Sequence, residues 1–308
     1  MAAGVVARRV LQATAALIVV LLVVFACLLA TGDPVDLLAP PEATEHDKAL
    51  LRRAYGLDRP VVYQFGAFVW RAARGDFGRS LFSDRPALAL VSERLPASLE
   101  LALASTVIAV AIGVPLGIVA AMRRATVVDQ IVIAVALLGQ SVASFWLALM
   151  LILLFAVSLQ WLPVSGRDGW TSLLLPAMAL SFWLLALLAR LTRSEMLEVL
   201  EQDYIRTARA KGMGTAAVVV RHGLRNALIP LVTVTGVSLG WQLGGAVVIE
   251  TVFAWPGLGT TLLEAVLRRD YPVVLAGVAL LSAVFVAINL LVDLLYAYID
   301  PRIRVGAA

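Results

Sequence analysis

The stretch EQDYIRTARAKGMG, residues 201–214, is the polar segment around which this apolar chain is organised. Apolar residues recur at helical spacing over about 194–211, and this spacing predicts a helix. Gly212 follows, where a helix can end on a left-handed residue that glycine adopts at low cost. A second short helix is expected to begin with Thr215 as its cap and to end at Gly223. The segment therefore predicts two short helices with a glycine break between them, at a membrane surface.

The composition of the whole chain excludes a soluble globular domain. The chain has 308 residues, 61% of them hydrophobic, and a mean hydropathy of +0.92. The charged residues, 15% of the chain, lie in the gaps between apolar runs, so the net charge of +4 indicates loop sidedness rather than nucleic-acid binding. Cys27 is the single cysteine, which excludes an internal disulfide and a cysteine-based metal site.

Apolar runs long enough to cross a membrane recur along the chain, since a spanning helix needs about 20 apolar residues. The runs lie at about 10–30, 97–122, 131–157, 172–190, 228–250 and 273–299. Their apolar residues are continuous rather than alternating, which argues against spanning strands. We therefore expect an all-α membrane protein with six transmembrane helices.

The positive charges predict the orientation of these helices, because Lys and Arg collect in short cytoplasmic loops. With a cytoplasmic N-terminus, the two short outer loops hold only Arg167, Arg268 and Arg269 among their basic residues. The other basic residues outside the long first outer loop then lie on the inner side. Both termini are therefore expected in the cytoplasm.

Catalytic and metal-binding constellations are not evident in the sequence. The only lysines, Lys48 and Lys211, lie outside any glycine-rich phosphate loop, so an ATPase would have to be a partner chain. His46 and His222 fall on opposite sides of the predicted membrane and cannot share a metal ion. We expect neither an enzyme nor a metal protein.

Glycines and polar residues inside the spans suggest two further features. Gly236, Gly240 and Gly244 lie four residues apart on one helix face, which permits close helix–helix approach. This face is either an internal packing seam or a seam against a second subunit. Polar groups within spans usually face the bundle or a water-filled path. The candidates for such a path are Gln140, Ser141, Ser144 and Gln242.

The polar segment resembles the EAA loop of ABC importer permeases, and in particular that of the dipeptide/oligopeptide/nickel branch. The resemblance rests on DYIRTARAKG (203–212) and RHGLRNALIP (221–230), and extends to GLDRP (56–60), GDFGRS (75–80) and ETVFAWPGLG (250–259). The long first outer loop resembles that of the first, B-type, permease of such systems. Residues 206–208 read Arg-Thr-Ala where Glu-Ala-Ala is usual in the wider family, so the docking side chain is left open.

The resemblance implies the type I importer permease fold and a division into three parts. Residues 1–30 form the N-terminus and first helix, residues 31–95 an extracytoplasmic loop, and residues 96–308 a five-helix core with a coupling loop at about 194–226. The outer loop would cap the helices, dock a binding protein, or do both. The residues expected to couple to the ATPase are Asp203, Tyr204, Arg206, Thr207, Ala208, Arg209, Lys211 and Gly212.

The resemblance also implies partners and a location. They are a second homologous permease, cytoplasmic ATPases that bind ATP and Mg, an extracytoplasmic binding protein and the lipid bilayer of a bacterial inner membrane, with no cofactor in this chain. The expected solute is a dipeptide or oligopeptide, with nickel chelates, glutathione or haem as alternatives. The rival class is an ion-coupled secondary transporter, which would need a carboxylate deep in the bundle and commonly inverted repeats.

Overall fold

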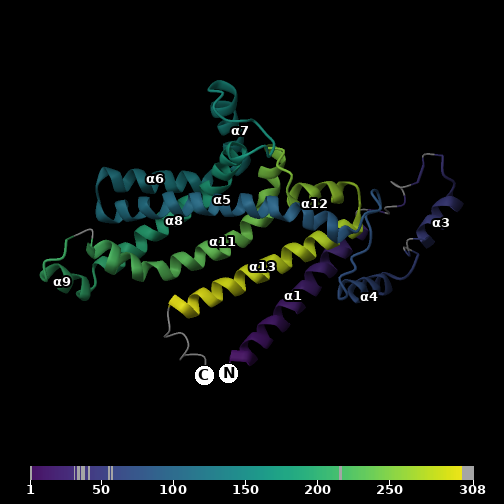
Figure 1. The fold of residues 1–308 in the computed structure, drawn as a ribbon, viewed down its shortest axis with the longest axis horizontal. Coiled ribbons are helices and arrows are strands. Elements are labelled where there is room, and N and C mark those ends of the chain that lie inside the picture. Colours follow the sequence, from purple (N-terminus) through teal and green to yellow (C-terminus); the bar gives the residue numbers. More distant parts are fainter. Residues whose placement is uncertain are drawn as a thin grey trace. The chain divides into compact units, whose positions relative to one another are not determined.

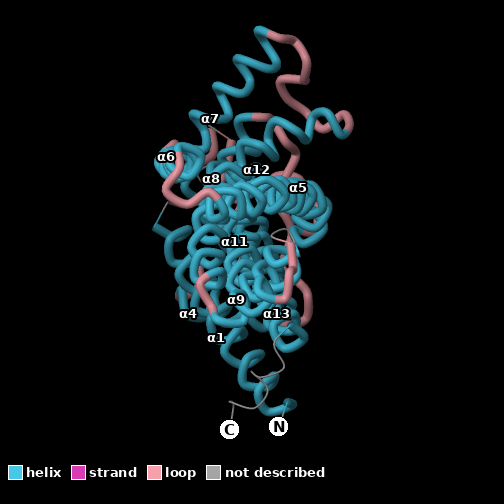
Figure 2. Tube along the Cα trace, turned by 90° about the vertical axis from the view of Figure 1, so that its left-hand side faces the viewer, coloured by secondary structure: helices cyan, strands magenta, loops and turns pink. Residues whose placement is uncertain are grey.

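Helices and the loops that connect them make up the computed structural model of this chain. It describes residues 2–30, 32, 35, 39–40, 42–54, 56, 58–214 and 217–299. Over these ranges no β-strand forms (Figure 2). Arg79 and Pro86 make an isolated antiparallel bridge. The predicted all-α class is confirmed.

The helices are labelled in chain order in Figure 1. They are α1 (Ala2–Ala30), α3 (Glu45–Ala54), α4 (Val61–Ala72), α5 (Ala87–Met122), α6 (Val127–Ser141), α7 (Ser144–Leu151), α8 (Trp170–Leu200), α9 (Asp203–Ala210), α11 (Arg225–Val252), α12 (Leu258–Leu267) and α13 (Tyr271–Ile299). Two π-helical segments extend this set: η1 (Ile152–Ser158) follows α7, and η2 (Val218–Leu224) precedes α11.

Four described helices are long and apolar enough to cross a membrane by length and composition. They are Ala87–Met122, Trp170–Leu200, Ala227–Val252 and Tyr271–Val292. These helices correspond to four of the six predicted runs. The predicted run at 10–30 lies in α1, and the part of that run whose side chains the structure describes without a gap, Thr14–Ala30, is apolar.

The predicted run at 131–157 is not one straight helix. α6 and the pair α7–η1 meet at an angle of 106°. The break occurs because Val142 and Ala143 adopt extended backbone, with ψ angles of 127° and 132°. Counted as one broken span, this pair raises the number of candidate spans to five. The apolarity of the run did not predict the bend, since both arms are apolar.

The chain packs into two compact units. The first comprises Met1–Ala97 and Pro256–Val286. One apolar core joins α1, α4, α12 and the first parts of α5 and α13, and it includes Phe25, Phe68 and Tyr271. The Tyr271 hydroxyl donates a hydrogen bond of 2.8 Å to the backbone oxygen of Leu28, which ties the start of α13 to the end of α1.

Asp270 is a buried carboxylate in this first unit. The Ser80 hydroxyl donates to it at 2.6 Å and the Leu81 backbone N–H at 3.2 Å. Burial raises the pKa of Asp270 above its usual value, and these hydrogen bonds oppose that change. The contacts fix the loop before α5 against the start of α13.

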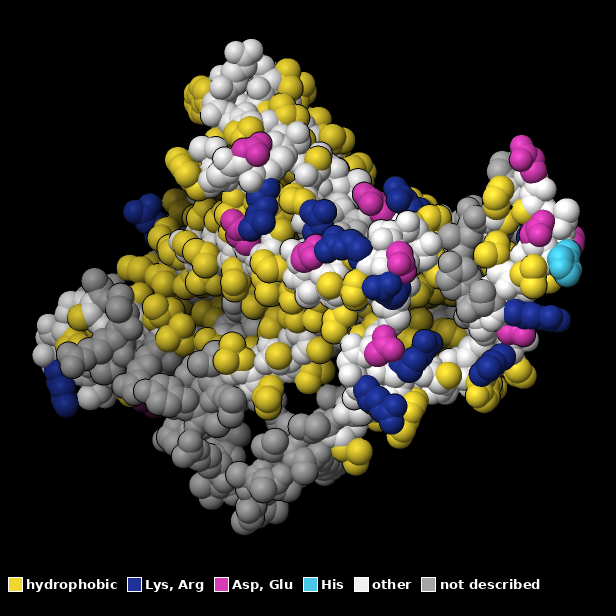
Figure 3. All heavy atoms as spheres, turned by 45° about the vertical axis from the view of Figure 1, so that its right-hand side comes forward, with side chains coloured by type: hydrophobic (Ala, Val, Ile, Leu, Met, Phe, Trp, Pro, Cys, Tyr) yellow, Lys and Arg dark blue, Asp and Glu magenta, His cyan; other side chains and the backbone are white. Residues whose placement is uncertain are grey.

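The second unit comprises Ser98–Trp255 and Ala287–Ala308. Its core centres on α8, and α5 packs closely on this helix at Gly117. A Cβ atom added there would lie 2.5 Å from the backbone oxygen of Ala189. Broad hydrophobic surfaces cover the long helices, as expected for lipid-facing spans (Figure 3).

Polar contacts join α5 to α11 within this unit. The Ser98 hydroxyl donates to the buried Glu250 carboxylate at 2.5 Å. Two turns further along α5, the Ser105 hydroxyl donates to the Gln242 amide oxygen, and Gln242 Nε2 donates to the Thr106 hydroxyl at 3.3 Å. These contacts give buried polar groups partners inside the bundle.

Candidate functional site

The predicted coupling loop, at about 194–226, begins within α8, which continues to Leu200, and α9 follows after two residues. The single helix predicted over about 194–211 is therefore wrong, because a turn at residues 201–202 divides it between α8 and α9. Asp203 lies in the first turn of α9, where its negative charge interacts favourably with the helix dipole. The Thr207 hydroxyl donates a 3.0 Å hydrogen bond to the Asp203 backbone oxygen, and Arg206 Nη1 lies 3.4 Å from the Asp203 carboxylate. These local contacts stabilise a short helix that has few tertiary ones.

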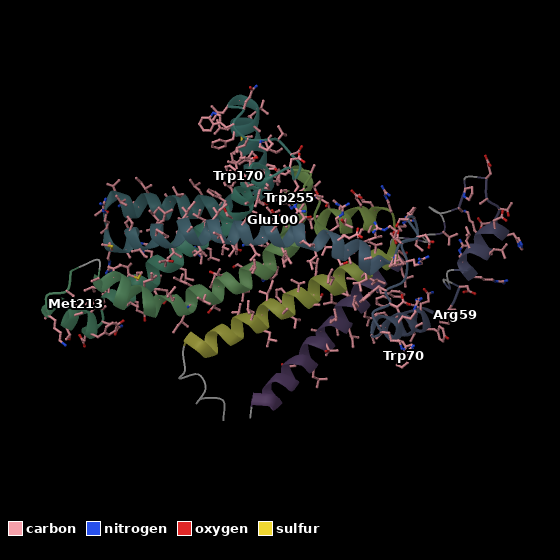
Figure 4. All side chains as sticks on the ribbon, in the orientation of Figure 1. Arg59, Trp70, Glu100, Trp170, Met213 and Trp255 are labelled. Carbon is pink, nitrogen blue, oxygen red and sulfur yellow. The ribbon has the colours of Figure 1, made fainter. Side chains whose placement is uncertain are left out.

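The inner face of α9 packs on its own chain. Ile205 and Ala208 are buried against Val218 of η2, with Met213 and Leu200 beside them. Figure 4 labels Met213 next to α9. Ala208, predicted to couple to an ATPase, therefore lies in the internal core of the loop, so its contribution to a docking surface would be indirect.

The outer face of α9 carries an aromatic residue among polar ones. Tyr204 is 43% exposed, and the side chains of Asp203, Arg206, Thr207 and Lys211 are exposed around it. The side chain of the predicted coupling residue Arg209 lies outside the described part of the structure. An aromatic anchor within a polar rim is the usual anatomy of a strong protein interface.

Gly212 adopts the predicted left-handed conformation, with a φ of +80°. A Cβ added there would meet no atom within 4 Å, so a larger residue would be strained by its backbone alone.

The second predicted helix differs from expectation. Thr215 lies outside the described residues. Gly223 does not end a helix, because η2 continues through it into α11. Gly223 is buried there, and a Cβ added to it would lie 2.9 Å from Cε at the flexible end of Met196 of α8, so this glycine lies in a packed contact rather than at a helix end.

Two ion pairs join the α5–α6 loop and the first turn of α6 to α8 and to Glu201, which follows it. Arg124 Nη1 lies 2.6 Å from a carboxylate oxygen of Glu201, with both side chains more than half exposed. Asp129 is 3% exposed and accepts bonds from Arg193 Nε at 2.5 Å and Nη2 at 2.8 Å. The buried pair is bidentate, the strongest geometry for a guanidinium and a carboxylate.

Sequence reasoning missed these ion pairs. Arg124 and Arg193 served there only to predict orientation, and Asp129 was overlooked. A usable signal was an acidic residue at the start of an apolar run, since a carboxylate at such a site usually has a cationic partner.

The path candidates lie in two environments. Gln140 and Ser141 end α6, and Ser144 begins α7, so all three flank the break in the helix. Ser141 and Ser144 are exposed, whereas Gln140 Nε2 is buried without a hydrogen-bond partner among the described residues. Gln242 instead accepts a hydrogen bond from the Ser105 hydroxyl of α5.

The glycine face of α11 also divides into two parts. A Cβ added at Gly236 would lie 2.1 Å from Val292 Cγ2 of α13, so this glycine serves packing within the chain. Gly240 is buried. Gly244 is exposed and a Cβ there would meet no atom within 4 Å, beside an exposed Trp241.

Comparison with known proteins yields one family. The model of the family described as "Binding-protein-dependent transport system inner membrane component" matches residues 113–305. A peptide transport system permease protein of Brucella abortus (strain 2308) is 44% identical over 306 residues, which cover 96% of this chain and 98% of that protein.

A second relative and a solved structure are also similar to this chain. The glutathione transport system permease protein GsiC of Escherichia coli (strain K12) is 45% identical over 273 residues, 89% of each chain. A chain of the MetNI methionine ABC transporter, solved in inward-facing conformations, superposes with a TM-score of 0.56 at 19% identity. It covers 68% of this chain and 96% of that one. At that identity the likeness concerns the fold alone.

Proposed function

The chain belongs to the family of binding-protein-dependent transport system inner membrane components and is a permease subunit of an ABC importer, and we propose that its solute is a short peptide or peptide-like molecule. The supporting observation is 44% and 45% identity, over most of the chain, to permeases named for peptide and glutathione transport. Glutathione is itself a tripeptide, so both names indicate one solute class. Nickel chelates and haem are the alternatives. The family predicted from residues 203–212 and 221–230 is thereby confirmed.

The family supports the partners in this proposal. An extracytoplasmic binding protein delivers the solute, and a second homologous permease completes the path. Cytoplasmic ATPase subunits bind ATP and Mg and hydrolyse the nucleotide, so this chain is a non-catalytic subunit without a cofactor of its own.

The proposed topology has six spans in a bacterial inner membrane with both termini in the cytoplasm. α1 supplies the first span, and the broken α6–α7–η1 pair supplies the third. The excess of basic residues in the α5–α6 loop and around α9 supports this orientation. Residues 31–95 then form the outer segment and residues 96–308 the transport core.

α9 is the proposed docking element for the ATPase. Tyr204 and its polar neighbours face outward, while Ile205 anchors the helix from beneath. Since α8 leads directly into this loop and Arg193 of α8 holds Asp129 of α6, a displacement of α9 would move both helices together. Such a rigid connection suits the inward-to-outward transition of an importer.

The proposed path passes the break between α6 and α7. Discontinuous helices in transporters expose backbone and side-chain polar groups at the solute site. Gln140 has a buried amide nitrogen without a partner in the described structure, and Ser141 and Ser144 are exposed nearby in sequence. Amide and hydroxyl groups suit the carbonyls of a peptide better than a bare ion. Gln242 would contribute from α11 only if its bonds to α5 exchanged.

The second permease is proposed to pack on the open part of the glycine face. Gly244 presents bare backbone and Trp241 a large exposed ring on α11. Close helix approach in lipid favours small residues at such contacts. The space beside Gly236, by contrast, is already filled by the side chain of Val292 of the same chain.

Transport by the reconstituted complex tests the solute and the energy source. Proteoliposomes would hold the two permeases and the ATPases, with ATP on the ATPase side, the binding protein and a radiolabelled dipeptide outside, and ionophores to remove ion gradients. We expect saturable uptake that requires ATP and the binding protein. If nickel chelates or haem, but not unlabelled peptides, competed with the labelled dipeptide, the proposed solute class would be wrong. Uptake driven by an ion gradient without ATP would contradict the assignment to the ATP-driven importers.

A further inference from the structure

A cavity of about 620 Å³ lies in the first compact unit, between α1, α3, α4 and the start of α13. Its lining divides by chemistry into a cationic rim and an apolar floor. The rim consists of Arg53, Arg59, Arg71 and Arg79. The floor includes Phe25, Phe68, Phe77 and Leu275. A cavity with these two parts suits an amphipathic, anionic ligand.

The charge of the rim is largely uncompensated. Arg79 pairs with Asp84 at 3.1 Å, and both line the cavity. Within the ranges that the structure describes, no carboxylate pairs with Arg53, Arg59 or Arg71. The Arg59 guanidinium lies 4.9 Å from the centre of the Tyr63 ring, which also lines the cavity. Guanidinium groups present forked donors that match phosphate oxygens.

Part of the floor is formed by residues that lie within α1 and α13, more than one turn from the helix ends that are near the rim. Phe25 lies five residues before the end of α1, which is about 7.5 Å along a helix. Leu275 lies four residues after the start of α13, or about 6 Å. The rim, in contrast, is carried by α3, α4 and the loops beside them. If α1 and α13 cross the membrane, the cavity runs from headgroup level into the hydrocarbon.

α4 gives an independent indication of a lipid surface. Its outward side chains include Val62 and Trp70, which are 84% and 63% exposed. The Arg74 guanidinium lies 4.4 Å from the centre of the Trp70 ring. Figure 4 labels Trp70 on α4 and Arg59 in the segment just before it. Tryptophan with neighbouring arginine is typical of helices that lie at the membrane interface.

We propose that this cavity binds an anionic phospholipid, with the phosphate on the arginine rim and the upper acyl chain on the aromatic floor. Phospholipid is the amphiphile that combines these two parts at this depth of the membrane. The proposal depends on α1 and α13 crossing the membrane and not on the identity of the transported solute. An acidic loop of a docking protein is the competing occupant.

Lipid binding by the intact complex tests the proposal. The full transporter, purified and exchanged into phosphatidylcholine nanodiscs, would be mixed with phosphatidylglycerol, and the bound lipid measured by native mass spectrometry after release. The test variant is Arg59→Gln with Arg71→Gln. The matched control is Arg85→Gln with Arg94→Gln, which removes the same charge from residues that do not line the cavity. Gel filtration and basal ATPase activity confirm that both are folded.

We expect the wild type and the control to retain phosphatidylglycerol over phosphatidylcholine, and the test variant to retain at least tenfold less. Increasing the salt concentration should weaken retention in the wild type. Equal retention by the test variant and the wild type would overturn the proposal.

Two further measurements distinguish a phospholipid from a free phosphate compound and from an acidic protein loop as the occupant of the cavity. Glycerol 3-phosphate carries the same phosphate without chains and should not displace the lipid; displacement as effective as that by short-chain phosphatidylglycerol would overturn the lipid assignment. The second arm adds the binding protein and measures ATPase stimulation. Normal lipid retention by the test variant together with lost stimulation would assign the cavity to protein docking instead.

Discussion

The coupling loop and the helical body next to it are built in opposite ways. α9 rests on a few buried side chains, Ile205, Ala208 and Val218, and its outer face is exposed. The body of α5, α6, α8 and α11 is joined by close backbone contact at Gly117 and by the buried pair of Asp129 and Arg193. The exposed face of α9 has few contacts within the chain and is available to bind a partner, whereas the tightly packed helices of the body are suited to moving as one rigid unit.

The largest effect is expected at the buried pair. Asp129→Ala leaves the Arg193 charge without its partner, and this should lower the free energy of unfolding by about 3–5 kcal/mol. The thermal loss of the monodisperse gel-filtration peak measures this effect. Asp203→Ala, at an exposed carboxylate of α9, is the control and should change little. If the two variants were equally stable, the body would not depend on the pair.

The glycine face should separate internal packing from subunit contact. Gly236→Leu forces a side chain into Val292 and should destabilise the chain by about 1–3 kcal/mol or more. Gly244→Leu meets open space, so the chain should stay folded while copurification with the second permease fails. Normal copurification of the Gly244 variant would move the subunit contact to another face.

The aromatic residue of α9 should matter most for docking. Tyr204→Ala removes the proposed anchor and should weaken ATPase retention by about 2 kcal/mol, roughly thirtyfold, through lost interface contacts. Titration of the purified permease pair with the ATPase measures the affinity. Arg221→Ala, in η2, should have the smaller effect, and the reverse order would place the docking surface on η2.

The turn after α9 should affect coupling more than stability. Gly212→Val forces a β-branched residue to a φ of +80° at a strain of about 1–2 kcal/mol or more, while its side chain meets no neighbour. The complex should assemble with reduced solute-stimulated ATPase activity. Full stimulation in an intact Gly212→Val complex would show that the turn is dispensable.

The smallest effect is expected at the exposed ion pair. Arg124→Gln removes the contact with Glu201, and because both side chains are solvated, the stability should change by about 0.2–1 kcal/mol. The same thermal assay applies. A loss as large as that of Asp129→Ala would mean that the outer pair, rather than the buried one, fastens the α5–α6 loop.

The sequence predicted much of this molecule because its signals are local. Continuous apolar runs predicted the helices that became α5, α8, α11 and α13, and Gly212 predicted a left-handed turn. The family was also readable, from motifs that lie together along the chain. The roles of the coupling, path and seam residues stay predictions.

Tertiary structure decided the features for which distant residues must meet. The break at Val142 and Ala143 was not predicted, because the run as a whole is apolar enough for one span and the polar residues beside the break are equally compatible with a straight helix. The pairing of Asp129 with Arg193 joins residues 64 positions apart. Gly236 and Gly244 are alike in sequence, yet one lies against Val292 and the other lies open. Spacing along a helix determines which residues share a face, but only the packing of the other helices determines what that face meets.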